Sequence, residues 1–155
     1  MSYTVNIGDR IPSFSIKDNE GDELTDDDLI GSPAVIYFYP KDNTPGCTKQ
    51  ACSFRDNMER LDDLETVVIG VSPDDAKSHE KFIKKQNLNF TLIPDENMEL
   101  CRKFNVKKGM LGIERTTFVI DSEGIIRWIE RPVDVTGHVD RVIHALEEIT
   151  SNELR

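Results

Sequence analysis

Three unbroken apolar runs limit this chain to a small set of folds. They are "AVIYFY" (34–39), "TVVIGV" (66–71) and "TTFVI" (116–120), and each is rich in β-branched or aromatic residues. Apolar residues that follow one another without polar alternation indicate strands that are covered on both faces. Such a sheet needs helices on both sides, so we expect an α/β fold.

Helical patterns lie between and after these runs. Residues 45–64 place apolar side chains three or four positions apart, at Ala51, Phe54, Met58, Leu61 and Leu64. Ser72 can cap a helix whose first position is Pro73, so we expect a second helix to begin there. A last helix has one apolar face, formed by Val139, Val142, Ile143, Leu146 and Ile149.

The pattern changes after residue 120. The turn signal "DSEG" (121–124) is followed at once by "IIRWIE", which predicts an antiparallel hairpin over 116–130. A parallel βαβ half, a hairpin and a closing helix form the thioredoxin-like layout, with a central mixed sheet flanked by helices. Extension strands are expected near the N-terminus around "SFSIKD", followed by a short helix capped by Thr25. We expect residues 1–155 to form a single domain.

Composition excludes several function classes. The chain carries 29 Asp and Glu against 19 Lys and Arg, a net charge of −10, which disfavours nucleic-acid and anionic-membrane surfaces. No apolar run approaches the ~20 residues of a membrane span, and no secretory signal pattern is seen. We therefore expect a cytoplasmic protein. Three cysteines fit redox chemistry or metal binding better than a disulfide framework.

Cys47 occupies a position suited to chemistry. The strand 34–39 leads through Pro40 into a turn and then a helix, and functional residues of α/β sheets lie beyond the carboxyl ends of strands. If Thr44 is the N-cap, Pro45 is the first helical residue and Cys47 is the third. An acid at this third position commonly bonds the free amides, so the backbone favours an ionised thiol there.

The helix end alone does not supply enough energy. Lowering a thiol pKa from ~8.5 to ~6 requires about 3.4 kcal/mol, whereas a helix terminus typically gives ~0.3–1 kcal/mol and at most ~2. A nearby cation must supply the rest. Sequence spacing does not choose among the candidates, which are Lys41, Lys49, Arg55, Arg115 and Arg127.

Cys52 follows five residues after Cys47. In an ideal helix this spacing separates the two Cα atoms by roughly 8.6 Å, and a disulfide tolerates little beyond ~7 Å. The pair can therefore bond only if the first turns of the helix unwind. Gly46, with the prolines before it, makes that end a plausible place to open.

Each cysteine could instead be a packing residue without a redox function. Cys47 as an inert buried thiol is disfavoured, because a Gly/Pro loop is not a core position. Cys52 as a packing residue is more credible. Packing is the default for Cys101, which we expect on a short helix near Leu100 and Phe104.

Metal binding and other thiol functions are the remaining alternatives. The cysteine pair supplies only two ligands, whereas structural zinc normally takes four. His79, His138 and His144 lie on helical stretches that are remote from the pair in sequence, and we expect all three at the surface. A thiol–disulfide oxidoreductase would more typically use a CxxC spacing. A copper carrier on a thioredoxin-like scaffold is a further candidate, which metal analysis would test.

The cysteine loop resembles a known family signature. "YFYPKDNTPGCTKQAC" contains Pro40-x-x-x-Thr44-x-x-Cys47, which looks like the active-site motif of the peroxiredoxins. The spacing to Cys52 resembles the subgroup called bacterioferritin comigratory protein or peroxiredoxin Q. Segments "GDRIPSFSIKDNEGDELTDDDL", "VVIGVSPDDAKSHEKFIKKQNLNFTLIPDE" and "GIERTTFVIDSEGIIRWI" are also similar, so the resemblance covers nearly the whole chain.

The resemblance implies a role for each matching residue. Cys47 corresponds to the peroxidatic cysteine, which attacks peroxide as a thiolate and becomes a sulfenic acid. Thr44 corresponds to the threonine that helps hold sulfur and peroxide oxygens, and Pro40 to the proline that shields the sulfur. Arg115 corresponds to the arginine that stabilises the thiolate, and Cys52 to the resolving cysteine.

The implied function is that of an antioxidant, thioredoxin-dependent peroxidase. It would reduce hydrogen peroxide and organic hydroperoxides, form a Cys47–Cys52 disulfide and be recycled by thioredoxin or a similar dithiol. No flavin, haem or metal motif is seen in the sequence, and this chemistry needs no cofactor. Members of the subgroup are often monomers, so a monomer is expected.

Overall fold

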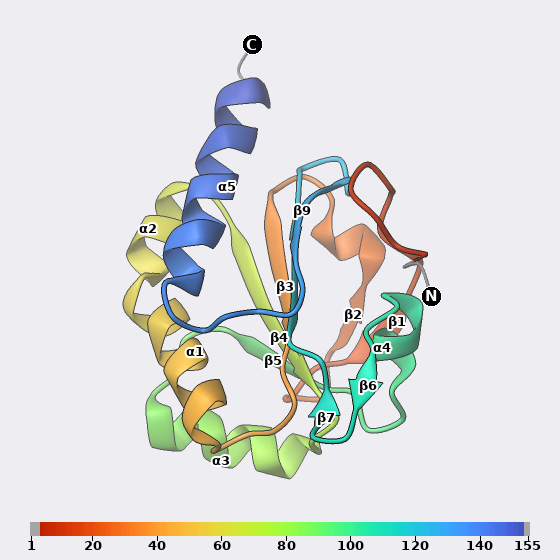
Figure 1. Ribbon diagram of the computed structural model, residues 1–155, viewed down its shortest axis with the longest axis vertical. Coiled ribbons are helices and arrows are strands. Elements are labelled where there is room, and N and C mark those ends of the chain that lie inside the picture. The colour runs from red at the N-terminus through yellow and green to blue at the C-terminus, as the bar shows by residue number, and fades with distance from the viewer. Residues whose placement is uncertain (1–3, 154–155) are drawn as a thin grey trace.

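The computed structural model describes residues 4–153, and a five-stranded mixed sheet forms its centre (Figure 1). The strands follow the order β5 (Thr91–Pro94), β4 (Val67–Ser72), β3 (Ala34–Phe38), β8 (Thr116–Ile120) and β9 (Ile126–Glu130). β3, β4 and β5 are parallel, whereas β8 is antiparallel to both β3 and β9. The expected mixed sheet and late hairpin are confirmed.

Alternating side chains of the apolar runs supply two cores. Val35 and Tyr37 of β3 pack with the helices on one face, whereas Ile36 and Phe38 pack into the opposite core. The helices on the first face are α1 (Pro45–Asp56), α2 (Met58–Asp63) and α5 (His138–Glu153), with α3 (Ala76–Gln86) beside the β5 edge (Figure 1). Burial on both faces explains why these strands lack polar alternation.

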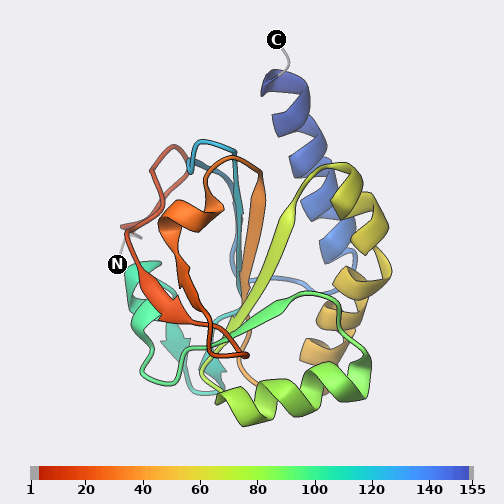
Figure 2. The same ribbon diagram turned by 180° about the vertical axis from the view of Figure 1, so that it is seen from behind.

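Shorter elements cover the second face (Figure 2). They are the hairpin β1 (Ser15–Lys17) and β2 (Glu23–Thr25), the 3₁₀ helix η1 (Asp26–Leu29) and α4 (Glu99–Lys103). The expected extension strand is confirmed, and so is the Thr25 cap, because Thr25 is the N-cap of η1 and its backbone N–H donates to the Asp28 carboxylate at 2.9 Å. A small hairpin, β6 (Lys108–Gly109) with β7 (Gly112–Ile113), precedes β8.

The helical pattern over 45–64 forms two helices. They meet at Asn57, whose backbone departs from helical geometry (φ −106°, ψ 12°). The Asn57 side-chain amide donates to the Ser53 carbonyl at 2.8 Å. This local bond competes with the regular helical ladder, and it ends α1 after three turns.

The helix expected to begin at Ser72 begins later. Ser72 instead continues β4, where its carbonyl accepts a hydrogen bond from the Asp95 N–H at 2.8 Å. The N-cap of α3 is Asp75, whose carboxylate accepts from the Ser78 N–H at 2.8 Å. The cap prediction at Ser72 is wrong because strand pairing holds this residue in the sheet.

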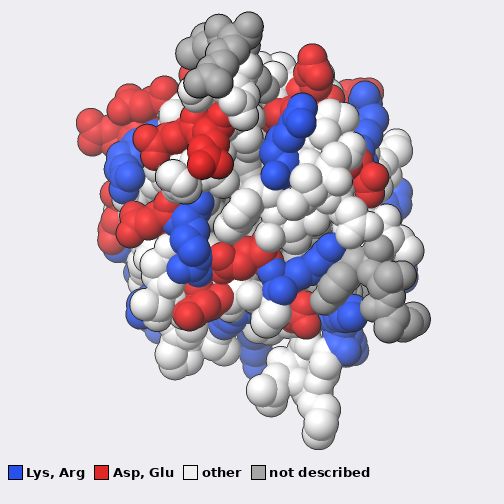
Figure 3. All heavy atoms as spheres, turned by 45° about the horizontal axis from the view of Figure 1, so that its top comes forward, with Lys and Arg blue, Asp and Glu red and all other residues white. Residues whose placement is uncertain are grey.

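The surface carries charge of both signs. On the face in Figure 3, acidic and basic side chains are interspersed. Within residues 4–153, no helix has the length and apolar character required to cross a bilayer.

Candidate active site

Cys47 lies at the start of α1, beyond the carboxyl end of β3. The N-cap is Thr44 (φ −87°, ψ 154°), Pro45 is the first helical residue and Cys47 is the third, as expected. The Cys47 side chain is only 1% exposed and belongs to the core under α1 with Ala51 and Phe54. The expectation that this is not a core position is wrong, because the first turn of α1 packs directly on the sheet.

The amides at this helix end are left available. The Thr44 hydroxyl donates to the Lys41 carbonyl at 2.9 Å, and no side-chain cap is formed at the N-terminus of α1. The first backbone N–H groups of a helix have no partner within the helix. The end of α1 that carries Cys47 therefore offers donors to a developing negative charge.

Arg115 supplies the cation that sequence spacing could not choose. Its Nη2 donates to Cys47 Sγ at 3.1 Å, and its Nη1 donates to Gln50 Oε1 at 3.0 Å. Sheet register explains the meeting, because Phe38 at the end of β3 pairs with Thr116, the residue after Arg115. A guanidinium donates in two fixed directions, so this one spans the first turns of α1.

Val133 fixes the backbone of Arg115, and Gly46 leaves space for its side chain. Its backbone carbonyl accepts from the Val133 N–H at 2.9 Å. A Cβ added to Gly46 would lie 2.7 Å from Arg115 Nη2, closer than real Cβ contacts allow. Gly46 therefore makes room for the guanidinium to reach the sulfur.

The other candidate cations are engaged elsewhere or exposed. Arg55 pairs with Asp56 at 2.9 Å, and Arg127 pairs with Asp121 at 2.6 Å. Lys41 and Lys49 are exposed.

A buried carboxylate anchors the loop before Cys47. Asp42 accepts hydrogen bonds from the Tyr39 hydroxyl at 2.7 Å and the Ser78 hydroxyl at 2.8 Å, and its carboxylate lies 2.7 Å from His79 Nδ1. The Asp42 N–H donates to Asp74 at 2.7 Å. Potential metal-ligating atoms of Asp42, Asp74 and His79 lie within 4.8 Å of one another, but these hydrogen bonds already occupy them. The network fixes the loop to α3.

Two of the three histidines are buried, which corrects the surface prediction. His79 and His138 are buried in the cores, whereas His144 is exposed as expected. The spacing of these two histidines from apolar helix residues could have indicated that they are buried. His138 precedes Val142 by four residues on the apolar face of α5, and His79 precedes Phe82 by three on α3.

Gln50 also belongs to the candidate active site, and sequence reasoning missed it. It is buried, it bonds Arg115, and its Nε2 lies 3.4 Å from His138 Nδ1. Burial lowers the pKa of His138 from 6.5 to about 4, so this imidazole is neutral at pH 7. One turn separates Gln50 from Cys47, a spacing that could have suggested a shared face.

The other two cysteines have different environments. Cys52 is half-buried, and its thiol donates to Gln86 Oε1 at 3.5 Å. It lies in the same uninterrupted helix as Cys47, and all three thiols are free. Cys101 is buried on α4, where desolvation and the nearby Asp95 raise the pKa of its thiol, so the packing expectation is confirmed.

Pro40 lies between the cysteine loop and the β6–β7 hairpin. It is half-buried, and a Cβ added to Gly112 would lie 3.3 Å from Pro40 Cβ. At the tip of this hairpin, Met110 and Leu111 are fully exposed. Pro40 therefore lies close to the β6–β7 hairpin.

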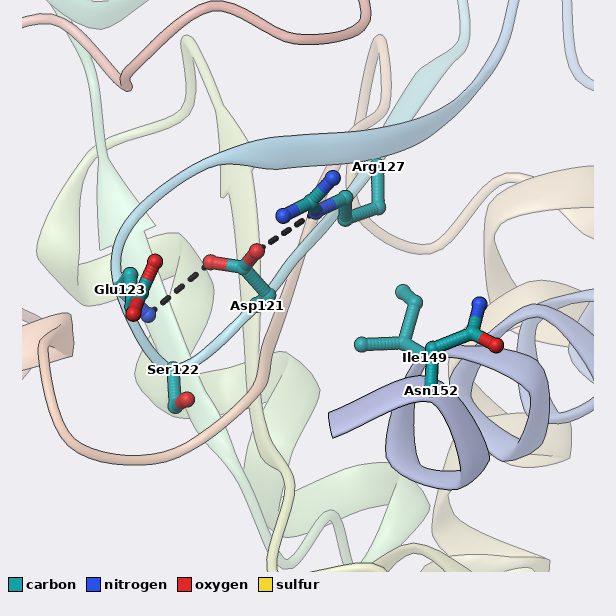
Figure 4. A pocket seen from close by; sticks show the side chains of 6 residues that line it. All are labelled: Asp121, Ser122, Glu123, Arg127, Ile149 and Asn152. Atoms are coloured by element: carbon teal, nitrogen blue, oxygen red, sulfur yellow. Dashed lines mark hydrogen bonds and ion pairs between the residues drawn. The ribbon is translucent and has the colours of Figure 1, made fainter. Parts of the chain in front are cut away.

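A separate pocket of about 450 Å³ is lined by Asp121, Ser122, Glu123, Arg127, Ile149 and Asn152 (Figure 4). It lies at the β8–β9 turn beside the C-terminal part of α5. Arg115 precedes β8 and Asp121 follows it, so this pocket and the thiol lie at opposite ends of the strand. The pocket is not part of the cysteine site.

Comparison with known proteins identifies the family. The family model described as AhpC/TSA family matches residues 7–129. The chain belongs to the AhpC/TSA family. It is 43% identical over 150 residues to a putative peroxiredoxin Bcp of Coxiella burnetii, covering 92% of this chain and 99% of that protein. It is 41% identical over 154 residues to peroxiredoxin Bcp of Bacillus subtilis, covering 95% and 98%.

Solved structures agree with this assignment. A mutant of Xylella fastidiosa peroxiredoxin Q has a TM-score of 0.89 and 33% identity, covering 95% of this chain and 98% of that one. Xanthomonas campestris bacterioferritin comigratory protein, studied for its alkyl peroxide reduction activity, has a TM-score of 0.87 and 34% identity, covering 96% and 99%. The thioredoxin-like fold and the resemblance to peroxiredoxin Q are confirmed. The chain is a peroxiredoxin, a thiol-dependent peroxidase, and this family implies a peroxide substrate and a thioredoxin-type reductant.

Proposed function

We propose that Cys47 is the peroxidatic cysteine of this peroxiredoxin. The contact that carries this proposal is the 3.1 Å hydrogen bond from Arg115 Nη2 to Cys47 Sγ at the N-terminus of α1. A guanidinium and uncapped amides at one sulfur stabilise a thiolate, and the thiolate is the nucleophile in cysteine chemistry. Neither Cys52 nor Cys101 has a comparable cation contact among the described residues.

In the first step, the Cys47 thiolate attacks the OH oxygen of ROOH. A sulfur–oxygen bond forms, the O–O bond breaks, and the departing RO⁻ takes up a proton to give ROH and Cys47 sulfenic acid. Negative charge develops on the leaving oxygen, so fixed donors near it accelerate the step. Arg115 and the α1 amides provide these donors, the Thr44 hydroxyl helps hold the peroxide, and Pro40 limits access of water.

In the second step, the Cys52 thiol attacks the sulfenic sulfur and a Cys47–Cys52 disulfide forms with loss of water. Both residues lie in α1, and the ideal helical separation of roughly 8.6 Å exceeds the ~7 Å limit of a disulfide. The first turns of α1 must therefore unwind. This opening breaks the bonds from Arg115 to Cys47 and Gln50.

An external dithiol protein of the thioredoxin type then reduces the disulfide and restores both thiols. The substrates are hydrogen peroxide and organic hydroperoxides. The working form is a monomer in the cytoplasm, where a reducing environment keeps the three thiols available for the cycle.

Peroxide consumption by single-cysteine variants tests this function. Cys47→Ser should abolish turnover with thioredoxin and its reductase, whereas Cys101→Ala should turn over normally because the Cys101 thiol stays protonated. Turnover by Cys47→Ser at the unsubstituted rate would assign the chemistry to another residue. Size-exclusion chromatography with light scattering would test the monomer.

A further inference from the structure

A line of buried polar contacts continues inward from the reactive thiol. Cys47 bonds Arg115, Arg115 bonds Gln50, and the amide of Gln50 reaches His138. His138 is the first residue of α5 and is 1% exposed. The line therefore joins the start of α1 to the start of the closing helix.

Proton placement along this line has one solution. Arginine has donors only, so the Gln50 atom that faces Arg115 must be the amide oxygen. The Gln50 NH₂ group then faces His138 Nδ1 at 3.4 Å, and this nitrogen must accept. The proton of the neutral imidazole is consequently on Nε2.

His138 Nε2 is buried and without a hydrogen-bond partner among the described residues. An unsatisfied buried donor destabilises a fold, so His138 lowers the stability of this chain. The same imidazole provides Nδ1 as an acceptor that faces the Gln50 amide. If the imidazole were protonated, Nδ1–H would face NH₂, and rotating the amide to relieve this would turn its NH₂ toward Arg115.

We propose that His138 is a positioning residue for the peroxidase reaction: it holds the Gln50 amide so that its oxygen fixes the Arg115 guanidinium on Cys47. This inference deepens the proposed function and rests on it. Neither His138 nor Gln50 touches the sulfur, so their effect on the reaction passes through Arg115.

The surroundings keep His138 in the required neutral form. The Phe54 ring lies edge-on to it, with centroids 5.6 Å apart. Burial is the largest cause that lowers the pKa of His138. Among the charged groups, Glu130 of β9 favours protonation, whereas Arg141 of α5 and Arg115 oppose it. Glu130 is itself paired with Arg141 at 2.7 Å, which limits its influence.

Two amide substitutions separate positioning from simple packing. Asn Oδ1 is the same number of bonds from the backbone as His Nδ1, whereas Gln Oε1 corresponds to Nε2. His138→Asn should therefore keep an acceptor for Gln50, and His138→Gln should lose it. His144→Asn is the matched control, because this imidazole lies exposed on the same helix.

The readout is the second-order rate of Cys47 oxidation by hydrogen peroxide, measured in single turnover across pH 5–9. We expect His138→Gln to lower this rate about 5-fold, the effect of one neutral hydrogen bond, and to move its pH midpoint upward. We expect His138→Asn to stay within about 2-fold of the unsubstituted protein. In a Gln50→Leu background, His138→Gln should add almost nothing, because coupled residues are not additive.

Equal rates and pH midpoints for His138→Gln and the unsubstituted protein would overturn the inference, as would an undiminished effect in the Gln50→Leu background. Thermal unfolding of each variant checks the fold, and His138→Phe, which retains the ring packing on Phe54, replaces His138→Gln if that variant unfolds. The Cys47→Ser variant distinguishes a failure of the proposed function from a failure of the positioning role. If it still reacts with peroxide, the proposed function fails, whereas if it is inactive and His138→Gln is normal, only the positioning role fails.

Discussion

Replacing Arg115 by Ala is the sharpest test of how the thiol is activated. The substitution removes the 3.1 Å donor to Cys47 Sγ and the 3.0 Å bond to Gln50. It leaves the amides of α1 in place, so the helix end acts alone. We therefore expect a slower reaction with peroxide and a higher pH midpoint for it.

The size of the effect follows from the contact. A Coulomb estimate for unit charges 3.1 Å apart gives about 5 kcal/mol at an effective dielectric of ~20. Arg115 is only half-buried, so solvent screening reduces this value. Hydrogen bonds to charged groups contribute about 1.5–3 kcal/mol, which corresponds to a fall of about 10- to 150-fold in rate. The helix end, at no more than ~2 kcal/mol, does not replace the loss.

Stopped-flow oxidation by hydrogen peroxide over a range of pH gives the rate constant and its midpoint together. Arg60→Ala is the matched control, because it removes the same charge from an exposed arginine on α2 that pairs with Asp140 at 3.4 Å. Arg115→Lys should recover part of the loss, since an ammonium keeps the charge without the two-directional fork. An Arg115→Ala rate and midpoint equal to those of Arg60→Ala would refute the reasoning.

Three further predictions concern other parts of the account. Gly46→Ala should push the guanidinium away, since its Cβ would lie 2.7 Å from Arg115 Nη2; the rate should fall about 10-fold or more with little change in thermal midpoint, and an unchanged rate would contradict the close approach. Cys52→Ser should consume one peroxide per chain and then stop with thioredoxin as reductant; continued cycling would mean that another thiol resolves. Because burial lowers the pKa of His138 from 6.5 to about 4, the unfolded chain binds the extra proton first, and roughly 3 kcal/mol of stability should be lost as pH falls from 6.5 to 4. Urea unfolding of His138→Asn should show a shallower acid decline; an identical slope would exclude this source.

Local patterns were sufficient to predict most of the fold. Continuous apolar runs identified the three central strands, and "DSEG" identified the β8–β9 turn, because both depend on neighbouring residues. The edge strand β5 was not predicted, since "TLIP" is short and its pairing with β4 comes from distant parts of the chain. The start of α3 was misplaced for the same reason, because sheet pairing at Ser72 overrides its capping propensity.

The candidate active site also combines features that local sequence predicts with contacts that depend on distant parts of the chain. Cys47 at the third position of a helix could be placed from the motif alone, and the magnitude argument required a cation. Only the antiparallel pairing of β3 with β8 brings Arg115 to the sulfur, a contact across 68 residues. Gln50, His138 and Asp42 meet their partners through contacts between distant parts of the chain, so their roles could not be assigned from the sequence. The helical spacing of Gln50 and His138 nevertheless contained part of the signal.

Intact mass after one equivalent of hydrogen peroxide, followed by peptide mapping, tests the central claim most directly. The account predicts a chain that has lost the mass of two hydrogen atoms, with Cys47 and Cys52 linked and Cys101 free. In Cys52→Ser it predicts a gain of one oxygen atom at Cys47. An unchanged mass, or oxygen found only on another residue, would contradict the assignment of Cys47 as the thiol that reacts with peroxide.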